Sequence, residues 1–307
     1  MISFTRHSRK SYLISALLVV ASIISLVFSG LNLGLDFTGG TVFHLNLGEG
    51  FTLEEVKEVI APFEELQGAA LQVVQGRDLQ GRITEEGVVI KTAYIKEERR
   101  EQIMEAFRER WSGLDPEDLR EENVGGVISG ELTYQSLLAL AVAIALMILY
   151  ISFRFEFKFA VATIAALLHD IIIVVGAFSV LQMEVNVPFV AAVLTVFGYS
   201  VNDSIIIIDR IRENIRHRRI EEYAAVVDLS ISQSLLRAIN TSLTTLLVLI
   251  AMLVGFYYFI GSFDLITFVV AIMIGVFVGT YSSIFVVSPL WLDLKRLEFR
   301  RARRRPA

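Results

Sequence analysis

Six long apolar segments dominate the pattern of hydrophobic and polar positions along the chain. They are residues 12–29, 134–153, 157–181, 188–208, 235–259 and 266–292. Each has roughly the 20 residues that a helix needs to cross a bilayer core at about 1.5 Å per residue. The pattern therefore predicts a polytopic α-helical membrane protein with six transmembrane helices.

The polar stretch between the first two apolar segments has the periodicity of a small α+β domain. Residues 41–47 alternate apolar and polar positions, as a half-exposed strand does. Thr52 and Glu55 have the spacing of a capping box, which predicts the start of a helix. Further elements are expected as strands at 71–75, 87–93 and 122–128 and as an amphipathic helix at 96–111. The order β-α-β-β-α-β predicts a ferredoxin-like split unit.

Charge is distributed unevenly along the chain, although the net charge is only −5. Residues 31–133 hold 21 of the 33 acidic side chains and 10 of the 28 basic ones. Outside this stretch, 17 Lys and Arg residues lie at the two chain ends and around the connections between the second and third and between the fourth and fifth apolar segments. The short loops 182–187 and 260–265 carry none. Because basic residues mark the cytoplasmic side, both termini are expected there and the acidic domain is expected outside the cytoplasm.

These patterns predict four regions. Residues 1–30 form a cytoplasmic N-terminus with the first helix, and residues 31–131 form the extracytoplasmic α+β domain. Residues 132–293 form helices two to six, and residues 294–307 form a basic cytoplasmic tail. The first apolar segment is longer than the usual signal-peptide core and is expected to stay as a membrane anchor. The small residues Ser29 and Gly30 nevertheless leave cleavage open as an alternative.

Composition argues against several other classes of protein. The chain is 54% hydrophobic, has a mean hydropathy of +0.59 and has no cysteine, so disulfides and thiolate chemistry do not arise. Its four histidines do not cluster with carboxylates at the spacing of metal ligands. We therefore expect no enzymatic activity, no cofactor, no metal site and no nucleic-acid partner.

Two charged residues in apolar segments are the strongest candidates for function. Asp203 lies in the fourth segment beside Asn202, and Arg237 lies in the fifth, with Asn240 one turn further on. An ionisable group inside a membrane is costly unless it has a partner or a water-filled cavity, so its presence points to function. We expect Asp203 and Arg237 to pair and to take part in proton coupling, with Asn202 and Asn240 beside them. The alternatives are snorkelling of Arg237 and a helix-end position for Asp203.

A second candidate lies near the middle of the third segment, where His169 and Asp170 are adjacent. Asp170 is the better candidate for a proton relay and His169 is a possible neighbour. The alternative is a purely structural hydrogen bond between helices. Small and hydroxyl residues in the fifth and sixth segments, including Ser282 and Ser283, are expected to serve mainly close helix packing.

The junction after the first segment reads GLDFTGGT, residues 34–41. Gly39 and Gly40 permit positive φ angles or a close approach of backbones, and Asp36 can hydrogen-bond within the turn. We interpret these three residues as a structural motif that orients the domain. A phosphate-binding loop is excluded because no helix N-terminus with a lysine follows.

Taken together, five motifs resemble the SecD/SecF family of protein-export translocase subunits, within the wider resistance-nodulation-division (RND) superfamily. They are GLDFTGGT at 34–41, VGGVISGEL at 124–132, LLHD at 167–170, GYSVNDSIIIIDRIREN at 198–214 and SLLRAINTSLTTLL at 234–247. The resemblance covers essentially the whole chain, and the order and spacing of the motifs make it specific.

The resemblance implies an accessory subunit in the cell (inner) membrane that promotes preprotein export with the proton-motive force. It implies a twelve-span unit with a SecD partner beside the SecYEG channel, with YajC, unfolded preprotein and membrane lipid as further partners. In the family, residues that correspond to Asp203 and Arg237 are implicated in proton conduction. Two alternatives are one half of an RND-type small-molecule exporter and a scaffold of the Sec channel that transduces no energy.

Overall fold

The computed structural model describes residues 3–48, 50–77, 83–111, 118–216, 218–260 and 262–303. The chain forms two compact units. A helical unit comprises Met1–Asn32, Leu138–Leu253 and Thr267–Ala307, and a second unit comprises Leu33–Leu137 and Val254–Ile266. Arg304 and Arg305 of the predicted basic tail lie outside the described residues.

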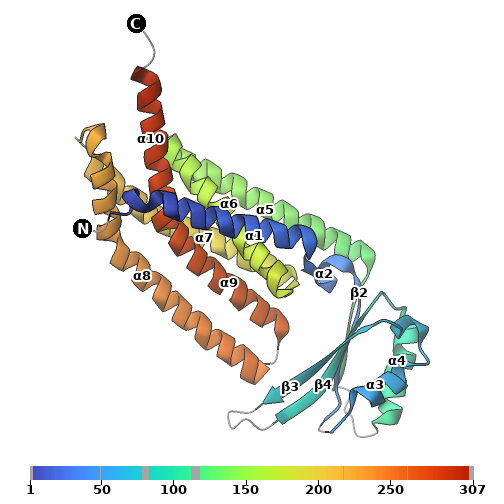
Figure 1. Ribbon diagram of the computed structural model, residues 1–307. Coiled ribbons are helices and arrows are strands. Elements are labelled where there is room, and N and C mark those ends of the chain that lie inside the picture. Colours follow the sequence, from blue (N-terminus) through green and yellow to red (C-terminus); the bar gives the residue numbers. More distant parts are fainter. Residues whose placement is uncertain are drawn as a thin grey trace. The chain divides into compact units, whose positions relative to one another are not determined.

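Long helices supply almost all of the helical unit (Figure 1). Its main helices are α1 (Ser8–Phe28), α6 (Phe157–Leu181), α7 (Val187–Ile215), α8 (Tyr223–Gly255), α9 (Phe263–Ser282) and α10 (Ser288–Arg303), together with most of α5 (Gly126–Arg154). Short elements between or before them are η1 (Thr5–His7), β1 (Asn32–Leu33), β6 (Glu184–Val185), η4 (Ile220–Glu222) and two π-helical turns, η5 (Phe256–Ile260) and η6 (Ser283–Val287).

Small residues allow α1 and α6 to pack tightly against each other. A Cβ atom added at Gly176 of α6 would overlap the side chain and backbone of Ser22 on α1. One turn further along, the hydroxyls of Ser25 and Ser179 lie 2.8 Å apart and form a hydrogen bond. Because apolar burial gives helices no advantage over lipid contact inside a membrane, such close approach and polar contacts hold helices together there.

The contact between α7 and α9 is built in the same way. Gly275 of α9 leaves room for the Val196 side chain of α7, and Gly279 faces Ser200 one turn further on. The π turn η6 continues α9 and contacts α1, α6 and α7. Figure 1 shows α1, α6, α7 and α9 running beside one another in this bundle.

Within the described residues, six helices are long and apolar enough to cross a membrane, which confirms the predicted number. Several of them extend well past the apolar segments from which they were predicted. Helix α5 begins at Gly126 instead of residue 134, α7 continues to Ile215, and α8 begins at Tyr223 instead of residue 235. The boundaries were wrong because hydropathy marks the part of a helix that suits hydrocarbon, whereas backbone hydrogen bonding continues into the polar flanks.

A four-stranded antiparallel sheet forms the second unit with two covering helices. Its elements are α2 (Leu35–Thr38), β2 (Gly40–Asn46), α3 (Leu53–Ile60), η2 (Glu64–Leu66), β3 (Ala70–Arg77), β4 (Ile83–Thr92), α4 (Glu97–Arg110) and β5 (Leu119–Val124). The strand order is β3-β4-β2-β5, with β2 and β4 in the centre. This order and the sequence of elements agree with the predicted β-α-β-β-α-β arrangement.

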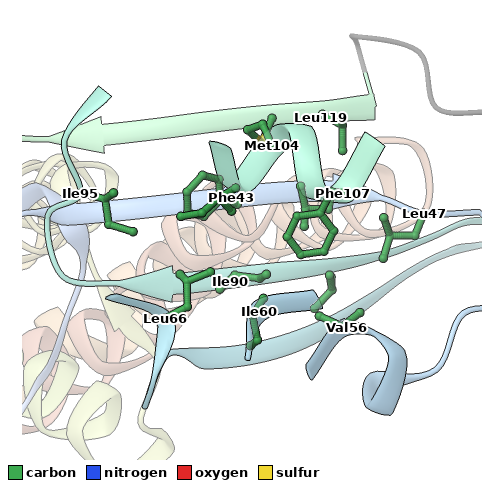
Figure 2. Close-up of a cluster of buried hydrophobic side chains, with 13 residues drawn as sticks. Phe43, Leu47, Val56, Ile60, Leu66, Ile90, Ile95, Met104, Phe107 and Leu119 are labelled. Atoms are coloured by element: carbon green, nitrogen blue, oxygen red, sulfur yellow. The ribbon is translucent and has the colours of Figure 1, made fainter. Parts of the chain in front are cut away.

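The core of this unit lies between the sheet and the two helices, as Figure 2 shows. Phe43 on β2 and Ile90 on β4 are completely buried, as are Val56 on α3 and Phe107 on α4. The amphipathic helix predicted at 96–111 turns Ile103 and Phe107 toward this core, and Trp111 packs against the same cluster. The alternation of apolar residues in β2 therefore serves one buried face.

One predicted strand needs correction. The last strand was expected at 122–128, but β5 covers Leu119–Val124 and α5 begins two residues later. Leu119 belongs to the core cluster and pairs with Leu45 of β2. The strand was placed too late because Val127 and Ile128, which were taken as strand residues, lie in the first turn of α5.

The predicted capping box at the start of α3 is present. The Thr52 hydroxyl accepts a hydrogen bond from the Glu55 amide, and the Glu55 carboxylate accepts one of 2.9 Å from the Thr52 amide. Hydrogen bonds from the Thr52 backbone and side chain, with Arg110 nearby, lower the pKa of Glu55 below its ordinary value of 4.5. A carboxylate that is favoured in the folded state stabilises the fold above that ordinary pKa.

We therefore predict that Glu55→Gln lowers the stability of this unit at neutral pH and that the difference from wild type disappears in acid. The stabilisation by Glu55 should be full above about pH 5 and should be lost as the pH falls through the lowered folded-state pKa. Limited proteolysis of the full chain between pH 3 and pH 7 measures this. A difference that grows toward acid would contradict the assignment.

A second prediction concerns helix packing in the other unit. Gly176→Ala should destabilise the helical unit by about 1–3 kcal/mol because its methyl group meets the Ser22 backbone. The matched control is Gly198→Ala on α7, where nothing lies within 4 Å of the added carbon. Thermal unfolding in detergent should separate the two variants. Equal melting temperatures would show that α1 and α6 do not approach this closely.

Candidate functional site

A buried polar network lies where α6, α7 and the junction of α9 with η6 meet. Asp170 of α6 is completely buried and is its centre. Its Oδ2 accepts hydrogen bonds of 2.6 Å from Ser200 of α7 and of 2.8 Å from Ser282 of α9. Its Oδ1 lies 2.9 Å from Nδ1 of His169. Three polar side chains on three helices therefore converge on one carboxylate and join α6, α7 and α9.

The neighbouring serines extend this network along α7. Ser204, one turn after Ser200, forms a 2.9 Å hydrogen bond with Ser283, and Ser283 also donates to the Ser200 carbonyl. Both Ser204 and Ser283 are buried. The contacts join α7 to η6 at a point where the helix has widened to a π turn, a feature that recurs at functional sites.

Asp203 lies in the same bundle, but the surroundings of its carboxylate are very different. The side chain is completely buried, and neither carboxylate oxygen has a hydrogen-bond partner within the described residues. The Thr280 hydroxyl of α9 faces the carboxyl. That hydroxyl is instead hydrogen-bonded to the Val276 carbonyl at 2.8 Å and to Ser242 at 2.6 Å. A buried carboxyl without partners is expensive in its charged form, so this site discriminates strongly between the two protonation states.

The predicted ion pair between Asp203 and Arg237 is not formed. Helices α7 and α8 adjoin, because Tyr199 donates a 3.3 Å hydrogen bond to Ser242. On α8, however, Ala238 is buried and the preceding Arg237 is exposed. Successive residues of a helix point about 100° apart, which turns the guanidinium away from the bundle interior. Within the described part of the chain, Arg237 makes no ion pair.

The two asparagines that were predicted beside this pair also lie on the outside of the bundle. Asn202 and Asn240 are both exposed. Asn202 lines a shallow, mostly apolar groove of about 490 Å³ between α5 and α7, together with Tyr150 and Gly198. The structure therefore separates the five predicted coupling residues into a buried carboxylate pair, Asp170 and Asp203, and an exposed set.

The junction motif adopts a conformation that requires its glycines. Gly39 has φ of 67° and Gly40 has φ of 143°, and a Cβ on Gly40 would lie 2.5 Å from the Thr92 carbonyl oxygen. Gly40 pairs with Val124 at the start of β2. Asp36 lies in the single turn α2 immediately before these glycines. These backbone angles explain the two glycines, because only glycine adopts them without strain.

Two models of known protein families match this chain. A family model described as "Protein export membrane protein SecD/SecF, C-terminal" matches residues 103–297. The model "SecD/SecF GG Motif" matches residues 24–48, which include Gly39 and Gly40. The chain belongs to the SecD/SecF family. The resemblance inferred from the five sequence motifs is thus confirmed, and the two matches reach most of the chain.

Individual members of the family show the same relationship. The chain is 39% identical to the protein translocase subunit SecF of Vibrio alginolyticus, over 95% of this chain and 90% of the relative. It is 39% identical to the protein translocase subunit SecDF of Thermus thermophilus, over 91% of this chain but only 37% of that longer relative. The crystal structure of the Thermus thermophilus SecDF, described as translocon-associated, matches with a TM-score of 0.78 and 35% identity. The match covers 96% of this chain and 39% of that one.

Sequence reasoning missed the serines that define the network. Ser200 and Ser204 were not singled out, and Ser282 and Ser283 were assigned only to packing. The available signal was the spacing of two serines four positions apart on either side of Asp203, because such serines project from one helix face. Asp228 was also missed, although it is buried and accepts hydrogen bonds from the Thr5 amide and hydroxyl.

The network generates a prediction about stability. The double variant Ser200→Ala with Ser282→Ala should destabilise the detergent-solubilised chain by about 1–3 kcal/mol, because it leaves Asp170 Oδ2 without donors. Thr195→Ala with Thr244→Ala is the matched control, because both threonines are exposed and bond only within their own helices. Thermal unfolding measures the difference. An equal loss of stability in both double variants would show that the hydrogen bonds to Asp170 do not stabilise the chain.

Proposed function

We propose that the chain is an accessory subunit of the Sec protein translocase that uses the proton-motive force, together with a SecD partner, to promote preprotein export. Membership of the SecD/SecF family supports the translocase role. The relatives named SecDF support association with SecD, because there the region similar to this chain is part of a longer chain. SecYEG, YajC and unfolded preprotein complete the proposed set of partners.

The orientation in the membrane belongs to the same proposal. The excess of Lys and Arg at the two ends of the chain and between α7 and α8 favours a cytoplasmic location for both termini. The acidic ferredoxin-like domain, proposed to span residues 31–131, would then lie outside the cytoplasm of a cell (inner) membrane. This position places the α+β domain where an emerging preprotein can be bound.

The observation that carries the coupling proposal is the burial of Asp203 without a partner. Neutralising such a carboxyl removes the penalty of a buried charge, and ionising it favours a conformation that supplies water or a cation. Proton binding therefore selects between two arrangements of the bundle. One elementary charge that crosses 100 mV supplies about 2.3 kcal/mol, so a few protons are sufficient to shift such an equilibrium.

Arg237 fits this scheme as the cation of the alternative arrangement. It lies on α8, next to the helix that carries Asp203, but faces away from the interior. Rotation of α8 or contact with the SecD partner would change its distance from the carboxylate. Asp170 differs because its carboxyl group already contacts Ser200, Ser282 and His169. We assign Asp203 the titrating role and Asp170 the role of holding α6, α7 and α9 together.

The test is export by translocase reconstituted with SecD and this chain, with and without an imposed proton gradient. Asp203→Asn should abolish the increase in export that the proton gradient produces. It should leave unchanged the export driven by ATP alone and the assembly with SecD. Asp209→Asn is the matched control, because it removes a carboxylate from the same helix at an exposed position. It should retain the increment.

The remaining outcomes distinguish the alternatives. A scaffold predicts that the gradient makes no difference to export with either wild type or Asp203→Asn. A half of a small-molecule exporter predicts no stimulation of export by the wild-type chain at all. Repeating the assay with a sodium gradient in place of the proton gradient identifies the ion, since a buried carboxylate can bind either one.

A further inference from the structure

A hollow lined by arginines lies between the start of α1 and the end of α10. Its volume is about 520 Å³, and the first turns of α1 with η1 form one wall while α10 forms the other. Four arginines are among the residues that line it, two from each wall: Arg6, Arg9, Arg296 and Arg300. These residues are almost 300 positions apart in the sequence, so their convergence is a product of the fold and not of a local run of charge.

The hollow has far more positive than negative charge. Asp293 is the single carboxylate among the lining residues. Its Oδ1 lies 3.9 Å from Arg296, at the limit of an ion pair, and its Oδ2 accepts a 3.2 Å hydrogen bond from Tyr12. Arg6, Arg9 and Arg300 have no ion pair among the described residues. Arginines crowded in this way repel one another unless an anion joins them.

Hydrogen bonds made by three of the lining residues hold the walls of the hollow in place. The Thr5 amide and hydroxyl both donate to Asp228 of α8, at 2.8 and 3.0 Å, which anchors the segment that carries Arg6 and Arg9. The bond between Tyr12 and Asp293 joins α1 directly to α10. The four arginines are exposed, but they extend from helical segments that these contacts fix relative to each other.

Position along the helices identifies the kind of anion. Arg9 and Arg6 precede the first apolar segment by three and six residues, and Arg296 and Arg300 follow the last one by four and eight. At about 1.5 Å per residue the four charges lie roughly 5–12 Å beyond the apolar part of the bundle. The headgroup region extends roughly 5–8 Å beyond the hydrocarbon core, so Arg9 and Arg296 lie within it and the long side chains of Arg6 and Arg300 can reach back to it. Leu13 and Leu17, one and two turns into α1, are exposed and offer a surface for acyl chains.

We propose that this hollow, lined by Arg6, Arg9, Arg296 and Arg300, is a binding site for the phosphate headgroup of an anionic membrane phospholipid. Guanidinium groups bind phosphate oxygens in pairs, which favours arginine over lysine at such sites. Basic pockets between membrane helices bind anionic headgroups in this way. A bound lipid would bridge α1 and α10 and neutralise the excess charge between them.

The proposal is tested on the detergent-solubilised full chain by native mass spectrometry. The probes are phosphatidylglycerol and phosphatidylcholine with the same acyl chains. Phosphatidylglycerol should bind the wild-type chain more tightly. Arg296→Gln with Arg300→Gln should weaken its binding by about tenfold or more, because each basic residue near a membrane surface contributes to the attraction. Equal binding of the two lipids by the wild type would overturn the proposal.

A matched double variant separates a built site from general surface charge. Arg216→Gln with Arg219→Gln removes the same charge from the segment between α7 and α8, outside the hollow. It should leave phosphatidylglycerol binding unchanged. If both double variants weaken binding alike, the attraction is diffuse and the hollow is not a site.

A third variant tests the site by strengthening it. Asp293→Asn removes the one negative charge in the lining and preserves an oxygen for the Tyr12 hydroxyl. It should tighten the binding of phosphatidylglycerol severalfold, a result that a misfolded variant does not produce. Unchanged or weaker binding by this variant contradicts the proposed position of the headgroup.

Competition with inorganic phosphate identifies the source of the anion. A lipid site gains affinity from acyl chains along α1, so millimolar phosphate should not displace phosphatidylglycerol. Displacement at that concentration would assign the hollow to a soluble phosphate and overturn the lipid assignment. The outcome is independent of Asp203, so it remains informative if the coupling proposal fails.

Discussion

The helical unit depends on the cost of burying carboxylates among apolar helices. Two aspartates, Asp170 and Asp203, are completely buried within it, and their surroundings differ. Asp170 is surrounded by donors from three helices, whereas Asp203 has none among the described residues. The first arrangement joins the helices that contribute these hydrogen bonds. The second makes the preferred arrangement of the bundle depend on whether the carboxyl is charged.

Close helix packing allows a change in the charge of Asp203 to move whole helices. Gly176 and Ser22 bring α1 against α6, and Gly275 brings α9 against Val196 of α7. Interfaces of this kind are tightly packed and resist small continuous deformation, so a change at one buried group is expressed as a shift of a whole helix. The serines between Asp170 and η6 supply hydrogen bonds along the same interfaces.

Much of this architecture could be predicted from the sequence. Apolar length revealed the six spans, and strand and helix periodicity revealed the order of elements in the α+β unit. Adjacent glycines after the first span and the Thr52–Glu55 box have local conformational causes, and both are seen as expected. Local patterns succeeded because each depends only on residues close in the chain.

Relations between helices were predicted less well. That Asp203 lies in an apolar helix was plain, but the direction in which Arg237 points depends on the rotation of α8, which no local pattern determines. The buried face of α8 is marked by the small residues Ser234, Ala238 and Ser242, whereas large apolar residues such as Leu236 and Leu243 are exposed. Hydrophobicity therefore does not reveal which face is buried. For the same reason the partners of Asp170 emerged only from the structure.

Proton flux through proteoliposomes that contain this chain and SecD tests the role of Asp203 directly. A membrane potential should drive flux in the wild type and in Asp209→Asn, and the flux should be lost in Asp203→Asn while the helical unit stays folded. Undiminished flux in Asp203→Asn would show that the buried, unpartnered carboxyl is not on the proton path.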